Sequence, residues 1–115
     1  MIVVAAHLDY ATSEIRNAVV AASAPIQMAT RTDEAGCHAY CFAADPGIDT
    51  RIQVYELWED QESLAAHFLH PNYEAMKELL VSNKPSNAWN RMYLVAKDEP
   101  VYGPNGEIRS TFFVN

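Results

Sequence analysis

Three side chains in the middle of the sequence, Glu56, Trp58 and His67, are of types that could do chemistry. The imidazole of His67 has a reference pKa of ~6.5, so it can take up or release a proton near neutral pH. Trp58 has a large aromatic face and an indole N–H donor. Glu56 lies two residues before Trp58, on the same face of an expected strand, and a buried carboxylate needs a partner. Taken alone, a histidine or tryptophan at the positions of His67 and Trp58 is more often a structural core residue than a site residue. For Glu56 a structural role and a functional role fit equally well.

The histidines and cysteines lack the spacing of a metal site, and we expect none. The histidines fall on separate segments without HxH or HxxxH spacing: His7, His38, His67 and His70. Cys37 and Cys41 lie four residues apart in an expected strand, with Cα atoms ~13 Å apart at ~3.3 Å per residue. A disulfide needs less than ~7 Å, so both thiols should be reduced, which fits a cytosolic protein.

The composition is that of one acidic globular domain. The chain has 115 residues, 50% of them hydrophobic, and a net charge of −7, which suits one core and a soluble protein. Its eight basic residues are scattered, so nucleic acid and anionic membranes are poor partners. The apolar start has no basic n-region, and no stretch reaches the ~20 apolar residues of a membrane span. We therefore expect a cytoplasmic location.

The first part of the chain predicts a strand and a helix. Residues 1–9 form a β-rich apolar run, and Thr12 or Ser13 can cap a following helix. Helical spacing predicts its buried face: Ile15, Val19, Ala22 and Ile26. Pro25 should kink or shorten the helix, and Gly36 ends the segment.

Two strands come next and form a hairpin. Residues 37–44 and 51–58 flank the turn signal Asp45-Pro46-Gly47. The alternation in the second strand predicts two faces, both of them apolar. One face carries Ile52, Val54 and Trp58, and the other carries Tyr55 and Leu57.

The last part predicts two helices and a strand. Asp60 can cap a short helix with Leu64, His67 and Phe68, and Pro71 suits the start of another. The apolar stripe of that helix is Tyr73, Met76 and Leu80. Residues 88–96 then read as a fourth strand and residues 107–114 as a short final strand, after a turn region over 100–106.

The element order β-α-β-β-α-α-β predicts an α+β, ferredoxin-like domain over residues 1–115, with a core over 1–96 and a tail over 97–115. Helices would cover one face of the sheet. Four strands ~4.8 Å apart and ~20 Å long leave roughly 400 Å² on the other face, as much as the largest apolar patch of a typical monomer. A two-fold homodimer would cover it, and the tail could reach the partner. Alternatively, the tail folds back over its own sheet.

Three motifs in order give the sequence a family resemblance. They are Glu34-Ala-Gly-Cys37-x-x-Tyr40, Val54-Tyr-Glu56-Leu-Trp58-Glu-Asp-Gln-Glu-Ser-Leu64-Ala-Ala-His67, and Pro71-x-Tyr73. Together they resemble the antibiotic biosynthesis monooxygenase family, which includes quinol monooxygenases and small stress-linked members. The similarity spans roughly residues 1–96, and Glu-x-Trp followed by Ala-Ala-His is its most specific part.

The resemblance implies a dimeric α+β barrel with a pocket between the helices and the sheet. In oxygenating members the pocket accepts a phenol or hydroquinone, and O2 is used without flavin, haem or metal. Carried over to this chain, the catalytic residues are His67 as general base, with Trp58 and Glu56, and the substrate-binding residues are Tyr40 and Tyr73. Further Asn or Arg side chains of phenol-oxidising members have no match identified in this sequence.

The leading hypothesis is therefore a cofactor-independent monooxygenase that oxidises a phenol or hydroquinone with O2 to a quinone. The first alternative is a non-catalytic ligand-binding or stress-response barrel. A haem-binding or haem-degrading relative is a second, although the position of its axial histidine falls at Lys77, a poor ligand because its amine is protonated. The third is an isomerase or lactone decyclase on the same barrel.

Overall fold

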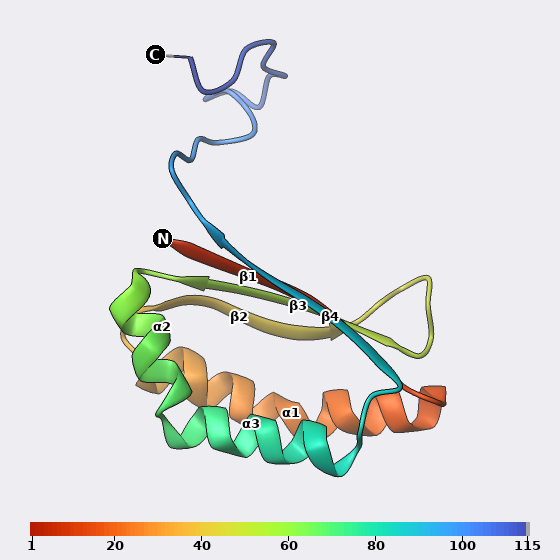
Figure 1. The fold of residues 1–115 in the computed structure, drawn as a ribbon. Coiled ribbons are helices and arrows are strands. Elements are labelled where there is room, and N and C mark those ends of the chain that lie inside the picture. Colours follow the sequence, from red (N-terminus) through yellow and green to blue (C-terminus); the bar gives the residue numbers. More distant parts are fainter. Residues whose placement is uncertain (115) are drawn as a thin grey trace.

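The computed structural model describes residues 1–114 and consists of one antiparallel sheet with helices on one face (Figure 1). The elements are β1 (Ile2–Asp9), α1 (Ser13–Asp33), β2 (Cys37–Ala44), β3 (Arg51–Trp58), α2 (Gln61–Phe68), α3 (Pro71–Ser82) and β4 (Asn87–Leu94). The strand order is β2-β3-β1-β4. This is the ferredoxin-like arrangement of a split βαβ unit, so the predicted fold is confirmed.

The C-terminal tail differs from the prediction. β4 ends at Leu94 rather than at residue 96, and the strand expected over 107–114 is wrong: the tail contains only an isolated bridge between Tyr102 and Ile108. The tail leaves the sheet on the side away from the helices and extends clear of it (Figure 1). A strand needs a neighbour to pair with, and within residues 1–114 the tail has none beyond that bridge.

The buried face of α1 is more polar than the apolar spacing predicted. Of the expected stripe, Val19 is fully buried and Ile26 packs on the core, but Ile15 and Ala22 are exposed. The other buried residues are Arg16, Ser23, Gln27 and Thr30. Arg16 and Gln27 lie there because backbone groups of the β2–β3 hairpin require partners. The hydroxyls of Ser23 and Thr30 instead donate to carbonyls of their own helix.

Side chains of α1 cover the outer edge of β2. Gln27 accepts a hydrogen bond from the Phe42 N–H at 2.9 Å and donates one to the Phe42 carbonyl at 3.0 Å. The guanidinium of Arg31 donates to the carbonyl of Tyr40 at 2.7 Å. Within residues 1–114, the outer edge of β4 pairs with no strand. One edge of the sheet thus has part of its backbone bound by helix side chains, whereas no strand of residues 1–114 pairs with the other.

Pro25 does not shorten α1, which was one of the two effects predicted for it, because the helix runs from Ser13 to Asp33. Packing before and after the proline, by Val19 and Gln27, anchors both halves on the sheet. Tertiary contacts of this kind override the unfavourable helix propensity of a proline in the helix interior.

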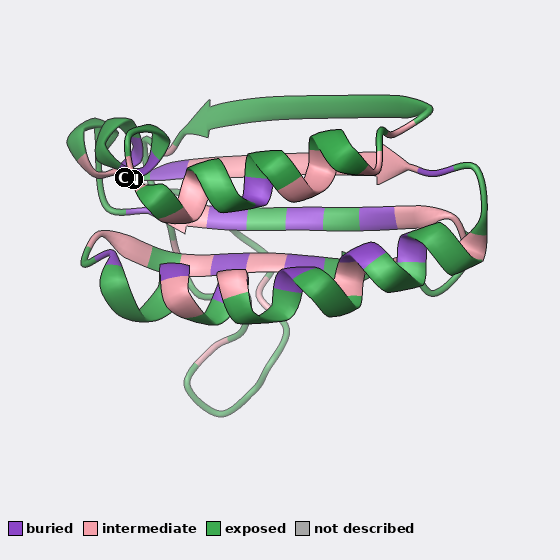
Figure 2. Cartoon of the chain, turned by 90° about the horizontal axis from the view of Figure 1, so that it is seen from below, coloured by how far each residue is buried: buried purple, intermediate pink, exposed green. Residues whose placement is uncertain are grey.

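The core lies between the helices and β1, β2 and β3. Its buried apolar residues are Ile2, Tyr10, Val19, Tyr40, Phe42, Ile52, Val54, Trp58, Leu64 and Met76. β4 is exposed along its whole length because it lies beyond the helix layer (Figure 2). Across residues 1–114, the helices are too short or too polar to span a membrane.

Local signals fix where α2 begins. Asp60 caps the helix, accepting from the Ser63 N–H at 2.8 Å. At the turn between α1 and β2, Gly36 accepts from the Glu59 N–H at 2.8 Å. A Cβ atom on Gly36 would lie 2.3 Å from Cβ of Ser63. The absence of a side chain at Gly36 therefore lets α2 sit directly against this turn.

The close approach at Gly36 predicts that Gly36→Ala destabilises the domain by about 1–3 kcal/mol, the usual cost of overpacking. The measurement is urea unfolding of the variant and the wild type. Gly47→Ala is the matched control, because a Cβ there meets only Asp45 Oδ1, at 3.6 Å. Equal stability of the two variants would contradict the packing argument.

Candidate functional site

A cavity of about 290 Å³ lies between the sheet and helices α2 and α3. We call it the inner cavity, and its lining is Val4, Tyr40, Phe42, Glu56, His67, Phe68, Tyr73, Met76, Lys77, Leu80 and Val81. Its volume is at the lower end of the ~300–1,000 Å³ typical of ligand pockets, and a mostly apolar wall with a few polar groups is also typical of them. Four of the five predicted site residues lie in this wall: Tyr40, Glu56, His67 and Tyr73.

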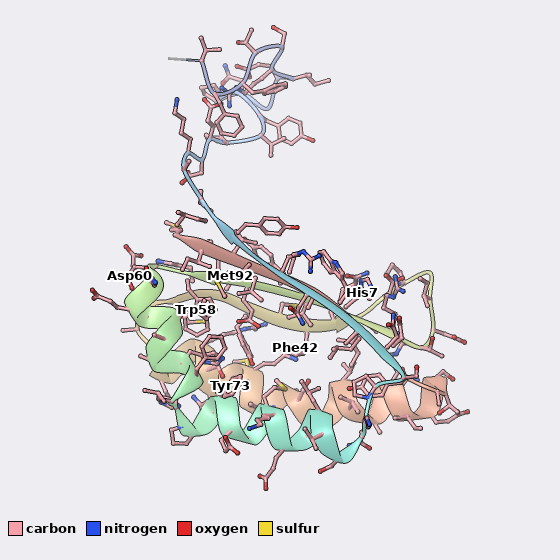
Figure 3. The ribbon with its side chains drawn as sticks, viewed as in Figure 1. His7, Phe42, Trp58, Asp60, Tyr73 and Met92 are labelled. Atoms are coloured by element: carbon pink, nitrogen blue, oxygen red, sulfur yellow. The ribbon has the colours of Figure 1, made fainter. Side chains whose placement is uncertain are left out.

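His67 is held among aromatic rings and is only 2% exposed. Its ring centroid lies 4.5 Å from that of Trp58, 5.5 Å from Tyr40 and 5.4 Å from Tyr73. Trp58 and Tyr73 lie between the sheet and the helices in Figure 3. Burial lowers the pKa of His67 below 6.5, and hydrogen bonding to Glu34 opposes that shift. The imidazole is therefore neutral at pH 7.

Glu34, which directly follows α1, is the main contact of His67 that the sequence reasoning missed. Its Oε1 lies 2.8 Å from Nδ1 of His67, and its Oε2 accepts a hydrogen bond from the Asn72 side-chain amide at 3.2 Å. Both residues lie inside the motifs quoted above, Glu34 as a first residue and Asn72 as the unspecified residue of Pro71-x-Tyr73. Their place inside these motifs was the one signal in the sequence that could have pointed to Glu34 and Asn72 as site residues.

Glu56 and Trp58 interact with each other, as their shared strand face allows. The indole N–H of Trp58 donates to Oε1 of Glu56 at 2.9 Å. Trp58 is 0% exposed and lies behind His67 rather than in the cavity wall. Burial raises the pKa of Glu56 to about 7, the indole N–H lowers it, and the charge of Glu34 raises it further. Glu56 is thus poised to exchange a proton near neutral pH.

Tyr40 on β2 and Tyr73 on α3 line the cavity from the sheet and from the helix layer. Tyr40 is 2% exposed, and burial raises the pKa of its phenol. It therefore stays protonated and can donate a hydrogen bond. Tyr73 stands edge-on to both His67 and Phe68.

A second, more open hollow of about 430 Å³ lies on the other side of the contact between Glu34 and His67. We call it the outer cleft, and its lining is Asp33, Glu34, Ala35, Gly36, Trp58, Asp60, Glu62, Ser63, Ala66 and His70. Glu34 lines the outer cleft while its partner His67 lines the inner cavity. The pair therefore separates the two hollows.

The arrangement is suited to proton transfer within an apolar space. The inner cavity contains a neutral imidazole, a carboxyl group that titrates near pH 7 and a protonated phenol. Within residues 1–114, no three His, Cys, Asp or Glu side chains are grouped closely enough to hold a metal ion.

Solved structures share this fold at low sequence identity. A Deinococcus radiodurans protein, described as a candidate antibiotic biosynthesis monooxygenase, is 18% identical with a TM-score of 0.77, over 90% of this chain and 100% of that one. A similarly described Caulobacter crescentus protein is 14% identical with a TM-score of 0.74, over 84% and 90%. A conserved Methanosarcina mazei protein is 20% identical with a TM-score of 0.70, over 80% and 89%.

The family assignment comes from the sequence comparison. No curated protein matches the chain. The family model described as antibiotic biosynthesis monooxygenase matches residues 1–79, more than half of the chain and all of the elements that bring Glu34, Glu56, Trp58 and His67 together. The chain belongs to the antibiotic biosynthesis monooxygenase family.

Proposed function

We propose that this protein is a cofactor-independent monooxygenase that oxidises a phenol or hydroquinone with O2 to a quinone. The observation that carries the proposal is that the neutral imidazole of His67 and the carboxyl group of Glu56 line one small apolar cavity. Such a site can bind an aromatic ring, remove its phenolic proton and keep bulk water away. Family membership supports the same reaction class.

The substrate supplies the electrons in this mechanism. His67 removes the phenolic proton, and the phenolate gives one electron to O2. The phenoxyl radical and superoxide combine to form a carbon–oxygen bond and a peroxide. The O–O bond then breaks, one oxygen stays on the ring as the quinone oxygen, and the other leaves as water. A hydroquinone reacts with the same stoichiometry, in which one O2 is consumed and one water is released, and gives a hydroxyquinone.

The reaction moves two protons, and the site has two groups, His67 and Glu56, that can carry them. The substrate loses its hydroxyl proton and the ring proton at the attacked carbon, and the departing water takes up both. His67 accepts the hydroxyl proton and returns it to the leaving oxygen. Glu56 accepts the ring proton, because its pKa of about 7 lets it both take and give a proton at working pH. Tyr40, which stays protonated, donates a hydrogen bond to the bound oxygen.

We further propose that the protein works as a homodimer in the cytosol, with the sheet faces packed together. The face opposite the helices exposes Tyr55, Trp89 and Tyr93 by 48%, 37% and 49%. The tail does not cover it, and its own apolar side chains Val101, Ile108 and Phe112 are 72%, 88% and 59% exposed. A two-fold partner would cover the sheet and give the tail a surface to pack on.

Removal of His67 should slow oxygen insertion strongly. With a menadiol-type hydroquinone and 18O2, we expect the wild type to give a quinone that carries one 18O atom. His67→Ala should lower the rate about 10²- to 10⁴-fold, the usual contribution of a positioned base. The measurement is the mass of the product against time. His38→Ala, which changes an exposed histidine paired with Glu59, is the control and should retain the wild-type rate.

Two results would reject this function. One is equal loss of the hydroquinone without O2. The other is a quinone without 18O together with hydrogen peroxide, since simple electron transfer to O2 leaves no oxygen on the ring.

The raised pKa of Glu56 predicts a pH-dependent stability difference between the wild type and Glu56→Gln. Between pH 4.5, its ordinary pKa, and about pH 7 the folded state keeps a proton that the unfolded state loses. Wild-type stability from this group therefore falls as the pH rises through that range. Glu56→Gln lacks this loss and should gain on the order of 2–3 kcal/mol relative to the wild type between pH 4.5 and pH 8.

The measurement is urea unfolding at several pH values. Glu78→Gln, an exposed change on α3, should follow the wild type at every pH. A constant difference between wild type and Glu56→Gln across the range would show that Glu56 titrates in the ordinary acid range.

A negative charge in the middle of the free sheet face should separate the dimer. Tyr55 pairs with Ala5 on one side and Cys41 on the other, so Tyr55→Glu should give a monomer in analytical ultracentrifugation. Leu69→Glu adds the same charge on the helix side, at a residue that is 89% exposed, and should stay dimeric. A wild-type monomer, or a dimer that Tyr55→Glu does not weaken, would contradict the sheet-face interface.

A further inference from the structure

We propose that Glu34 and Asn72 are positioning residues that hold His67 in one orientation and one tautomer, with Nε2 as its basic atom. The effect on turnover rests on the function proposed above, but the positioning itself does not. Neither residue was among the predicted site residues.

The carboxylate of Glu34 joins all three helices at one point. It directly follows α1. Its Oε1 lies 2.8 Å from Nδ1 of His67 on α2, and its Oε2 accepts from Asn72 on α3 at 3.2 Å. Glu34 is only 9% exposed and His67 only 2%. Each oxygen of a buried carboxylate thus has its own donor, so neither partner can leave without cost.

Hydrogen-bond chemistry fixes the tautomer of His67. The side-chain amide of Asn72 can only donate through its nitrogen, so Glu34 accepts on that side. A carboxylate likewise favours an N–H at Nδ1 of His67. A neutral imidazole carries one proton, which leaves the lone pair on Nε2. Within residues 1–114, Nε2 makes no hydrogen bond, although the side chain lines the inner cavity.

The charge of Glu34 is also placed to support the protonated ring. When Nε2 takes a proton, the imidazolium is formed beside a carboxylate at hydrogen-bond distance. Without Glu34, burial among Trp58, Tyr40 and Tyr73 would oppose that charge. A carboxylate that orients a histidine and stabilises its imidazolium has this role in the serine-protease triad.

Other ionisable groups also face His67 and enter any pH profile. His70, at the start of α3, lies 3.9 Å from Oε2 of Glu34 and accepts from the Asn72 N–H through Nδ1 at 3.0 Å. Glu56 on β3 shares the inner cavity with His67, as do Tyr40 on β2 and Tyr73 on α3. A test must therefore read His67 directly.

The experiment is NMR of protein labelled with 15N in its histidines, because the shifts of the two ring nitrogens report which one carries the proton. We expect wild-type His67 to be protonated at Nδ1 only. Glu34→Gln keeps the size and removes the charge, so the pKa of His67 should fall by at least about one unit. Asn72→Ala keeps the charge of Glu34 but frees its carboxylate to turn, so it should add a population of His67 protonated at Nε2, and it provides a milder variant should Glu34→Gln fold poorly.

The matched control is Glu62→Gln, because Glu62 also lines the outer cleft but is exposed and does not contact His67. Its effect on the pKa of His67 should stay within about 0.3 units. A wild-type His67 protonated at Nε2 would overturn the proposal. So would a Glu34→Gln shift no larger than that of Glu62→Gln.

Turnover of the menadiol-type hydroquinone separates this proposal from the proposed function. We expect Glu34→Gln to lower kcat about 10²-fold with KM changed by less than about threefold, because the base is weakened while the binding surface remains. If the wild type does not turn the compound over, the proposed function fails, while the NMR titration still decides the positioning. An active wild type with an unchanged kcat in Glu34→Gln overturns the effect of Glu34 on turnover and leaves the proposed function standing.

Discussion

The contact between Glu34 and His67 ties the end of the first helix to the second helix, and the shape of the site depends on it. A carboxylate shielded from water must find donors, and Glu34 finds them on α2 and α3. The two short helices are therefore held against α1 by a polar contact as well as by apolar packing. Glu56 is buried to a similar degree but, among residues 1–114, accepts a hydrogen bond from the indole N–H of Trp58 alone. Burial therefore dominates at Glu56 and raises its pKa to about 7.

Small local features let this contact form. Gly36 leaves room for Ser63, so α2 starts against the turn that follows Glu34. Asp60 fixes the first turn of α2, and Pro71 with the cap residue His70 fixes that of α3. His67 lies near the end of a helix of only eight residues, and a shift of that helix would move the imidazole directly.

Local periodicity explains how much of the fold and the site could be predicted. The i, i+2 rule placed Glu56 and Trp58 on one strand face, and β3 has the predicted bounds. Contacts between distant segments follow no such period. Glu34 and His67 are 33 residues apart, and their meeting depends on how α1 ends over α2. The polar face of α1 was missed because the buried Gln27 and the partly exposed Arg31 bind backbone groups of β2, which apolar spacing cannot indicate.

The two edges of the sheet have unequal freedom to accept another strand. Gln27 and Arg31 occupy backbone groups of Phe42 and Tyr40 that a new strand would need at β2. Within residues 1–114, no strand pairs with the outer edge of β4, so an extended segment can add there. Growth of the sheet, whether by ordered strand addition or by aggregation of partly unfolded chains, is thereby directed to β4. The helix that ends at the site, α1, is therefore also the element that makes the two edges of the sheet unequal.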